Sequence, residues 1–599
     1  MRFPLFSLAS AVFSVVLVAA CTASPPSAGT GFVRVDQVGF ALDETKYAYL
    51  LSPKDPGDVG FDVVDSAGQK VFSAVAGPGG EAWNDTFGAV RVLDISAVKT
   101  PGDYRILVSG ATPSPQFRVA PAAELFEPLV AANVRFFQAQ RDGADFVPSA
   151  LRPGPAHLND RKATVYRVPR YNDTATEMLD KRLVPDGGPV DVSGGWADAG
   201  DFLKFTHTAA YSVSALQVAQ RDSRVGGADL AAEARHGMDW LDRMWDASSG
   251  TLYAQVGAGV GNDAVRTDHD VWRLPESDEI TDRPVFRAAA PGDPISPNLA
   301  GKVTAAFALA AQLDTGEGAQ RKLDKAAKLY AQADRHPSGE LTTAFPHAFY
   351  PEDSWQDDLE FAAVELALAG KALGDPRTDE WTRDAGQWAA AYLASETKGT
   401  LGVGDVSALA HADLIRLGDA TGAVSRDDLV RDLARQLDAG RARAAQDPFH
   451  AGASYTEFDS VPHTFGLATT ARLYERATSA DTYAAFGTQQ RNWVLGANAW
   501  GSSFVIGVGA VFPRCPEHQA ANLTGETLTG AAVNGPNQAD RFAELNRFPT
   551  MRSCAVPDFA QFDGHGARYL DDVGAWQSVE PADDFTAGAL LYFALSSGQ

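Results

Sequence analysis

Two aspartates and a distant glutamate are the side chains of this sequence best placed to carry out acid–base chemistry. Asp198 and Asp201 stand three positions apart in the segment 194–205, with only alanine and glycine between them. Glu580 follows Trp576 in a second segment near the C-terminus. Two neighbouring carboxylates can hold one water molecule, and a carboxyl group from another segment can face that water across a sugar ring. Direct displacement at an anomeric carbon requires this arrangement.

Spacing alone does not identify such a site. The 76 acidic residues among 599 would place one acid three positions from another roughly ten times by chance. An aspartate that precedes an apolar helix most often caps that helix, and an isolated glutamate is most often a solvated surface residue. The interpretation therefore depends on the segments around these carboxylates.

Several segments, in this order, resemble glycoside hydrolase family 9, the family of inverting cellulases and related β-glucanases. They are 194–201 (GGWADAGD), 268–272 (DHDVW), 355–359 (WQDDL), 495–509 (LGAN to SFVIGVG), 535–537 (GPN) and the end from Asp571 to Glu580. The resemblance covers almost the whole chain after the leader. It implies hydrolysis of β-1,4-glycosidic bonds in cellulose-like glucans with inversion of the anomeric configuration.

The resemblance also implies a role for each carboxylate. Asp201 is the general base that deprotonates water, Asp198 helps to hold that water, and Glu580 is the general acid. A general acid needs a pKa raised toward neutrality by a partly apolar pocket, and Trp576 and Val579 are candidate walls. Asn usually precedes this glutamate in the family, so Val579 predicts the loss of one sugar contact.

Substrate contacts follow from the same resemblance, because aromatic faces stack on sugar rings and polar tips bind hydroxyl groups. The candidates are Trp196, His269, Trp272, Tyr350, Trp355 and His518. His518 matches a family histidine that binds sugar hydroxyls near the cleavage point. Many members have His-His-Arg where this chain has Glu517-His518-Gln519, so we expect a substrate preference different from that of an ordinary endoglucanase.

No cofactor is expected for the chemistry itself. Family members commonly bind calcium near the segment that resembles Asp357-Asp358, and hard oxygen ligands suit that ion. A structural calcium ion is therefore an expectation, but the sequence does not supply a full ligand set. Zinc-ligand spacing, a phosphate-binding loop and a Ser/His/Asp arrangement are all missing from the sequence.

Residues 31–120 have the pattern of a β-sandwich. About seven short apolar segments alternate with turn signals such as Pro56-Gly57 and Pro101-Gly102, which is typical of an immunoglobulin-like module. Family members often carry such a module before the barrel, and the segment 36–40 (DQVGF) resembles its start. It has no evident sugar-binding aromatic face, so we expect a structural module that packs on the barrel.

Residues 121–599 have a helical pattern. Ten segments, among them 229–245, 299–313 and 428–444, are rich in Ala and Leu, and apolar residues recur at i, i+3, i+4 and i+7 in most of them. Long loops rich in Gly, Pro, Asp and aromatic residues join them, and such loops can gather at one end as a site. The predicted fold is thus multidomain, an all-β immunoglobulin-like sandwich followed by an all-α (α/α)6 barrel.

The first 21 residues resemble an export signal. Arg2 precedes an apolar run that ends in Val18-Ala19-Ala20-Cys21. This end resembles a bacterial lipobox, in which the cysteine is lipidated; the alternative is ordinary signal cleavage at small residues. Residues 22–30 are then a linker. We expect an exported protein, either anchored by lipid at the extracellular face of the cell membrane or secreted.

The cysteine count and the net charge limit the compartment and the classes of binding partner expected for this protein. If Cys21 carries lipid, then Cys515 and Cys554 remain, and an even pair in an oxidising compartment favours a disulfide. No second apolar run reaches about 18 residues, so the lipid is the only membrane contact expected. The net charge of −25 argues against nucleic acid or an anionic membrane surface as partner, whereas a neutral β-glucan or oligosaccharide is compatible.

Two alternatives remain open on the sequence. One is an exo-acting member, such as a β-glucosidase, a cellodextrinase or an exo-glucosaminidase, which the altered His-His-Arg segment would suit. The other is a non-catalytic glycan-binding lipoprotein, which the intact carboxylates disfavour. A product profile on cello-, xylo- and chito-oligosaccharides separates these alternatives from an endoglucanase.

Overall fold

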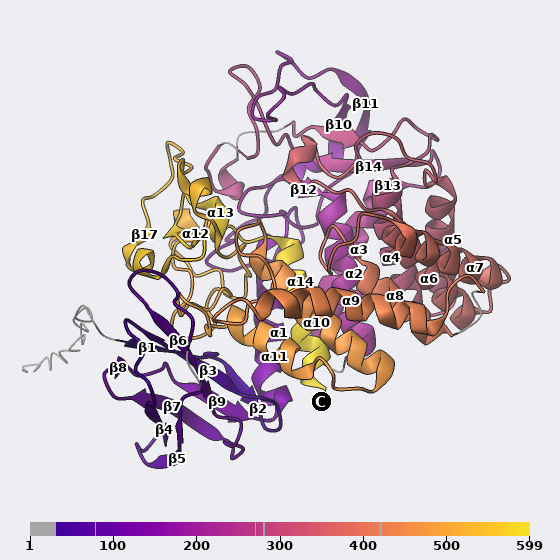
Figure 1. Cartoon of the computed structure of the whole chain (residues 1–599). Coiled ribbons are helices and arrows are strands. Elements are labelled where there is room, and N and C mark those ends of the chain that lie inside the picture. Colours follow the sequence, from indigo (N-terminus) through magenta and orange to yellow (C-terminus); the bar gives the residue numbers. More distant parts are fainter. Residues whose placement is uncertain are drawn as a thin grey trace, which may run out of the picture.

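The computed structural model describes residues 31–598, apart from 78–79, 224, 270, 279–281 and 419–421. The export signal, the lipobox cysteine Cys21 and the linker predicted for residues 1–30 lie outside the described residues. Among the helices that are described, none has the length and apolar character needed to span a membrane. Figure 1 shows a module of strands beside a larger domain of helices.

The N-terminal module is a sandwich of two sheets, with strand orders β6-β3-β1-β8 and β2-β9-β7-β4-β5. Its strands are β1 (Gly31–Arg34), β2 (Gly39–Ala41), β3 (Tyr47–Ser52), β4 (Gly60–Asp65), β5 (Lys70–Val75), β6 (Ala89–Asp94), β7 (Gly102–Val108), β8 (Ala111–Thr112) and β9 (Phe117–Ala120). Side chains alternate between the two faces of a strand, so Phe61 and Val63 of β4 join Leu50 of β3, from the other sheet, in a core between the sheets. The predicted immunoglobulin-like sandwich is confirmed.

Two rings of helices form the second domain. The inner ring is α2 (Thr206–Asp222), α4 (Pro297–Leu313), α6 (Gln356–Leu373), α8 (Ser407–Leu417), α10 (Ser460–Thr478) and α14 (Asp583–Ser597), each in contact with the next, and α14 closes the ring on α2. The outer helices are α1 (Ala122–Gln140), α3 (Gly227–Met244), α5 (Gly316–Gln332), α7 (Thr378–Ala394), α9 (Arg426–Ala444) and α11 (Ala484–Val494). The predicted (α/α)6 barrel is confirmed.

Burial distinguishes the two rings. α14 is buried along nearly its whole length, and α4 is buried from Pro297 through Ala311. A helix with neighbours on every side must be apolar all round. α5, by contrast, buries only five residues, which lie along one stripe, because its other faces meet solvent.

Short strands and helices occupy the connections between the long helices. They are β10 (Ala163–Tyr166), β11 (Pro185–Val190), β12 (Lys204–Phe205), β13 (Trp245–Asp246), β14 (Thr251–Val256), β15 (Val285–Arg287), α12 (Gln519–Thr524), β16 (Asn537–Gln538), β17 (Ala555–Val556), β18 (Ala567–Arg568), β19 (Asp571–Asp572) and α13 (Trp576–Val579). One sheet has the order β11-β10-β15-β14-β12, with β13 on β14. It lies at one end of the barrel (Figure 1).

The module packs on the barrel, as predicted, through the segment 36–40. The buried guanidinium of Arg491 in α11 contacts Asp36 Oδ2 at 3.0 Å and Glu44 Oε1 at 2.8 Å. The side-chain amide of Gln37 donates to the carbonyl oxygen of Gly501 at 3.0 Å. A buried arginine needs such carboxylate partners, so these contacts fix the module on α11.

Candidate active site

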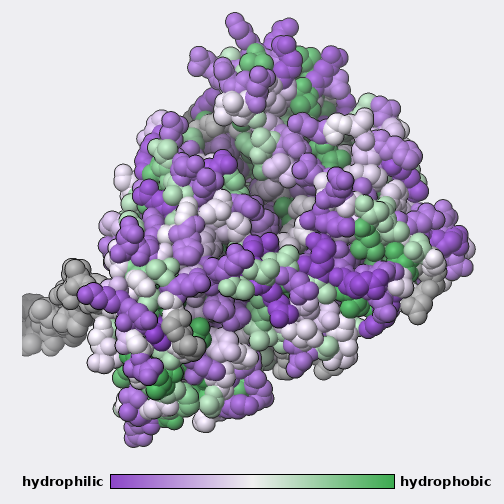
Figure 2. Space-filling model, viewed as in Figure 1, coloured by the Kyte–Doolittle hydropathy of each residue, from purple (hydrophilic) through white to green (hydrophobic). Residues whose placement is uncertain are grey.

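The predicted carboxylates lie where inner helices begin. Asp198 and Asp201 come shortly before α2, and Glu580 comes shortly before α14; Asp459, which the sequence did not single out, immediately precedes α10. The N-terminal end of a helix carries a partial positive charge that favours carboxylates. In Figure 2 the surface is hollowed near the middle of the view, above the place where Figure 1 labels α2 and α14.

Backbone hydrogen bonds join segments that are distant in sequence near the predicted carboxylates. The amide of Asp583 donates to the carbonyl oxygen of Asp198 at 2.8 Å. The amide of Gln519 donates to the carbonyl oxygen of Gly200 at 2.8 Å. The segment 198–201 therefore lies beside both the start of α12 and the start of α14.

Asp201 has one oxygen held and one directed toward a histidine. Its Oδ1 accepts from the amide of Leu203 at 2.7 Å, and its Oδ2 is 4.0 Å from Nε2 of His269. Burial raises the pKa of Asp201, while the charge of His269 opposes that rise. A carboxylate with a raised pKa and a free oxygen can accept a proton from water.

Asp198 is held more tightly than Asp201. Its Oδ1 accepts from the hydroxyl of Thr208, and its Oδ2 accepts from the hydroxyl of Tyr350 at 2.5 Å. Burial raises the pKa of Asp198 to about 7, with the negative charge of Asp201 adding to the rise. Asp198 is thus fixed beside Asp201, and Tyr350 stands at the reacting carboxylates.

Glu580 is part-buried at the end of α13. Desolvation raises its pKa well above the ordinary value, and the charge of Glu517 is the next largest cause. Trp576 stacks on Phe458, with ring centroids 5.3 Å apart, while Val579 is fully buried in the core. A raised pKa favours the protonated form of a carboxyl group, which is the form that acts as a general acid.

Two of the six predicted substrate contacts lie at the carboxylates. Tyr350 bonds Asp198, and His269 faces Asp201 with about a third of its side chain exposed. His269 also packs on Phe349, with ring centroids 5.3 Å apart. Trp355 is half-buried and meets Trp388 edge to face, and no contact joins it to the carboxylates within the described part of the chain.

Trp196 and Trp272 do not belong to the site, and their prediction as substrate contacts was wrong. Trp196 is 2% exposed, and its indole N–H donates to Glu233 Oε1 at 2.8 Å. Trp272 is 3% exposed, stacks on Phe548 and donates to Asn522 Oδ1 at 3.0 Å. Both indoles are satisfied within the protein and have no free face for a sugar.

His518 is also a structural residue rather than a sugar ligand. It is 3% exposed, its Nδ1 accepts from the amide of Ala521 at 3.1 Å as the cap of α12, and its Nε2 lies 2.8 Å from Gln140 Oε1. Burial lowers the pKa of His518 to about 3, so the ring is neutral and both its nitrogens are engaged.

Sequence reasoning missed four carboxyl groups near the catalytic ones, those of Glu517, Asp459, Asp584 and Asp583. Glu517 interacts electrostatically with Asp201 and Glu580, and Asp584 interacts with Asp198 and Asp459. The fourth, Asp583, is bonded to Asp198 through its amide. The sequence signal for Glu517 was its place in the segment that departs from His-His-Arg. In that segment the sequence analysis assigned the sugar contact to the neighbouring His518 instead.

Asp357 and Asp358 do not fit a calcium ion. The carboxylate of Asp358 lies 2.7 Å from the ammonium of Lys302, and Asp357 accepts from Ser354 Oγ at 2.5 Å and from the amide of Val406 at 2.8 Å. An ammonium group thus takes the position of a cation in this cluster.

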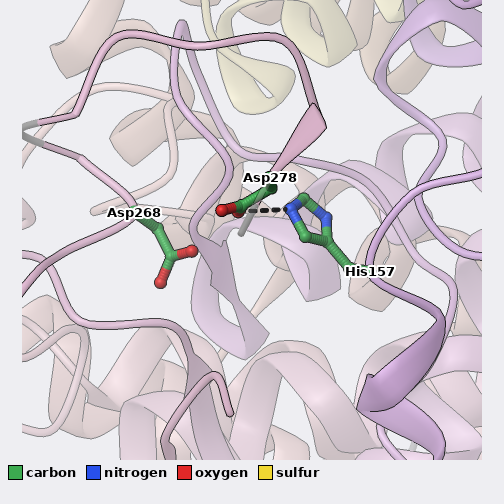
Figure 3. Close-up of side chains that lie close together, drawn as sticks. All are labelled: His157, Asp268 and Asp278. Atoms are coloured by element: carbon green, nitrogen blue, oxygen red, sulfur yellow. Dashed lines mark hydrogen bonds and ion pairs between the residues drawn. The ribbon is translucent and has the colours of Figure 1, made fainter. Parts of the chain in front are cut away.

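A second group with metal-ligand residue types is His157, Asp268 and Asp278 (Figure 3). Nε2 of His157 lies 2.9 Å from Asp278 Oδ2. Arg273 contacts Asp278 at 2.7 Å, and Arg283 contacts Asp268 at 3.1 Å. These guanidinium groups neutralise the carboxylates, so we assign the group no metal.

Arg283 connects this charged network to the catalytic loop. Its guanidinium donates to the carbonyl oxygen of Phe202, next to Asp201, and contacts Asp160 Oδ2 at 2.8 Å. The network therefore braces the backbone that carries Asp201.

The predicted disulfide is present. Cys515 and Cys554 are bonded, with their Cα atoms 5.4 Å apart. Cys515 is two residues from Glu517, so the bond anchors the segment that leads into the site.

Comparison with known proteins identifies the family. The sequence model of glycosyl hydrolase family 9 matches residues 126–593, and that of the cellulase N-terminal ig-like domain matches residues 29–113. The two matches correspond to the barrel and to the sandwich. The chain belongs to glycosyl hydrolase family 9, and its reaction is the inverting hydrolysis of a glycosidic bond.

Relatives include a xyloglucan-specific endo-β-1,4-glucanase of Bacteroides ovatus, 25% identical, with 98% of this chain and 97% of the relative covered. Endoglucanase A of Bacillus pumilus is 27% identical over 66% of this chain and 62% of its own length. Among solved structures, a single-mutant thermostable endoglucanase of Alicyclobacillus acidocaldarius has a TM-score of 0.70 at 21% identity, covering 95% of this chain and 99% of that one. This likeness supports the fold.

Proposed function

We propose that this protein is an exported endo-acting glycosidase that cleaves β-1,4 bonds of a glucan chain. The observation that carries the proposal is that Asp201 and Glu580, from segments at opposite ends of the barrel sequence, lie close enough for the charge of Asp201 to help raise the pKa of Glu580, which favours the protonated form of that acid. Relatives named as endo-β-1,4-glucanases support the substrate class, as does a structural neighbour in complex with cellobiose-like isofagomine.

The reaction follows from these two carboxyl groups. Asp201 accepts a proton from a water molecule while the water oxygen attacks the anomeric carbon. The bond from that carbon to the glycosidic oxygen breaks, and Glu580 delivers its proton to the departing oxygen. The product carries the inverted, α configuration, because one displacement occurs.

Neighbouring residues position the base and the substrate. Asp198, fixed by Thr208 and Tyr350, holds the attacking water beside Asp201. His269, with part of its ring exposed beside Asp201, can donate to a sugar hydroxyl. Arg283 holds the loop that carries Asp201 through the carbonyl oxygen of Phe202. Chemistry confined to such preorganised groups needs no cofactor.

A product profile tests the proposal. Cellohexaose and soluble β-1,4-glucans should yield products of several lengths from the earliest times, and Asp201→Asn and Glu580→Gln should abolish this hydrolysis. Release of monomer alone would favour the exo-acting alternative. No hydrolysis of any glycan by the folded protein would favour a glycan-binding protein instead.

Export with a lipid anchor on Cys21 is part of the proposal. The disulfide between Cys515 and Cys554 supports an oxidising compartment. Radioactive palmitate should label the protein in its host, and Cys21→Ala should remove the label and release the protein into the medium. Unchanged, unlabelled secretion of both forms would contradict the anchor.

A further inference from the structure

His157 lies between two carboxylates, one at each ring nitrogen. Its Nδ1 is 2.8 Å from Asp142 Oδ1, and its Nε2 is 2.9 Å from Asp278 Oδ2 (Figure 3). The side chains of all three residues are at most 5% exposed. A carboxylate only accepts hydrogen bonds, whereas a neutral imidazole has a single donor. Both contacts are satisfied only when both ring nitrogens carry protons, so the geometry calls for an imidazolium ion.

The charges around His157 balance when it is protonated. Among the residues that the structure describes, four carboxylates and three lysine or arginine cations form one buried network with it. The ion pairs join Lys204 to Asp142 and Asp160, Arg283 to Asp142, Asp160 and Asp268, and Arg273 to Asp268 and Asp278. A buried charge without a partner is costly, and the imidazolium supplies the fourth positive charge.

The neighbouring charges also favour the protonated ring. Burial and the charge of Arg283 lower the pKa of His157, but Asp142 and Asp278 outweigh them, so this pKa is raised above its ordinary value. Burial raises the pKa of Asp142, but the charges of Lys204 and His157 hold it well below its ordinary value. Asp142 is therefore a carboxylate and not a proton donor to the ring.

The network contacts the loop that carries the proposed base. The ring of His157 packs on that of Phe202, with centroids 5.5 Å apart, and Phe202 directly follows Asp201. The guanidinium of Arg283 donates to the carbonyl oxygen of Phe202. The position of Asp201 therefore depends on side chains that His157 holds together.

The network also reaches the histidine that faces the base. Oδ1 of Asp268 contacts Arg283 at 3.1 Å, and its Oδ2 accepts from the amide of Ala258 at 3.2 Å. The next residue, His269, has its Nε2 4.0 Å from Oδ2 of Asp201. A shift of the network would thus change both sides of this pair.

We infer that His157 is a positioning residue for the base: as an imidazolium ion it holds the loop of Asp201, and release of its proton to solvent at higher pH lowers catalysis. The inference rests on the proposed role of Asp201. Neutral imidazole leaves either Asp142 or Asp278 without its hydrogen bond, and one negative charge of the network is then uncompensated. Misplacement of a catalytic group by about 1 Å can lower the rate about hundredfold.

The pH dependence of a neutral variant tests this inference. kcat and KM on a soluble β-1,4-glucan are measured for the natural protein and His157→Gln, from below the ordinary histidine pKa of about 6.5 to alkaline pH. We expect kcat of the natural protein to exceed that of the variant about tenfold or more at low pH, with similar KM. This ratio should fall toward one as the pH rises, because both side chains are then neutral. A ratio that is constant over the whole range would indicate a merely structural residue and overturn the inference.

His411 in α8 provides a matched control. It is fully buried, and its Nδ1 lies 2.7 Å from Glu360 Oε1. His411→Gln also removes a buried histidine from a carboxylate partner, but in an inner helix rather than beside the loop of Asp201. Its ratio of kcat to that of the natural protein should not change with pH. The same pH dependence in both variants would contradict a specific role for His157.

Nitrogen NMR of the protein with 15N-labelled histidine reads the charge without turnover. The signals of His157, identified by their loss in His157→Gln, should show two protonated nitrogens up to a midpoint above about 6.5, and kcat should fall over the same range. Asp278→Asn removes one cause of the raised pKa and should lower the midpoint. The signals that move in Asp278→Asn identify His157 if His157→Gln does not fold. A midpoint at or below the ordinary value would overturn the inference.

The two readouts separate this inference from the proposed function. If glycans are cleaved but His157 titrates at or below its ordinary pKa, the inference fails and the proposed function stands. If no glycan is cleaved but His157 stays doubly protonated above that pH, the proposed function fails and the charge assignment stands.

Discussion

The hydroxyl of Tyr350 donates a 2.5 Å hydrogen bond to Oδ2 of Asp198, joining residues 152 positions apart in the chain. The hydroxyl of Thr208 binds the other oxygen of the same carboxylate. Both hydroxyls favour the ionised form, against the burial that raises the pKa of Asp198 to about 7. The orientation and the charge of Asp198 therefore depend on a residue from a distant loop.

Tyr350→Phe should lower kcat about tenfold or more and move the acidic limb of the pH profile to higher pH. Loss of a donor to the ionised carboxylate raises the pKa of Asp198 further, so Asp198 stays protonated to higher pH. Profiles of kcat/KM measure the shift. Tyr483→Phe removes a similar bond, to Asp438 at 2.9 Å, outside the site and should leave the profile unchanged; equal shifts in both variants would refute the role of Tyr350.

Glu580→Gln should lose activity on natural glycans by orders of magnitude, because an amide cannot protonate the departing oxygen. The same variant should keep much more activity on substrates with acidic leaving groups, such as dinitrophenyl glycosides or glycosyl fluorides. Initial rates on both substrate types measure the difference, with Glu526→Gln as the control. A loss of the same size on both types would remove the assignment of Glu580 as the acid.

Reduction of the bond between Cys515 and Cys554 should destabilise the loop that enters the site. The two cysteines are 39 residues apart, and the chain-entropy relation for a loop of that size gives about 4 kcal/mol. We expect Cys515→Ser with Cys554→Ser to lower Tm and weaken activity. Dithiothreitol should lower the Tm of the natural protein but not that of the double variant, and no effect in the natural protein would contradict the expectation.

His518 should make the folded protein sensitive to acid. Its pKa of about 3 in the folded state lies below the ordinary value of about 6.5, so the unfolded chain binds a proton that the folded chain does not. Stability is then lost as the pH falls from about 6.5 toward 3. Urea unfolding of His518→Gln should show a smaller loss over this range, while His336→Gln, which removes an exposed histidine, should match the natural protein.

Strong local patterns made the fold predictable. Alternating apolar residues gave the sandwich, and helical periodicity located ten of the twelve long helices. The two that were not located are α1 and α8. α1 contains Pro128, and a proline inside a segment argues against a helix there. α8 has only 11 residues. The small sheet at the end of the barrel, with two-residue strands such as β12 and β13, depends on long-range pairing that no local pattern records.

Side-chain direction explains what could not be predicted about the site. Glu517 and His518 are neighbours in sequence, yet one enters the site and the other caps α12, because the backbone between them turns at the start of that helix. Trp196 is a second example, because its indole is directed into the core toward Glu233 and away from the substrate site. Family motifs located the segments but could not say which residue of each segment faces the substrate.

The stereochemistry of the first product tests the central claim most directly. If Asp201 activates a water molecule and Glu580 protonates the departing oxygen, a β-glycoside must yield the α-anomer first, and the two carboxyl groups must stand roughly 6.5–9.5 Å apart to admit the water. Proton NMR during early hydrolysis separates the two anomers before mutarotation mixes them. We predict the α-anomer; a β-anomer, or a glycosyl group trapped on any carboxylate, would show double displacement and contradict both assignments.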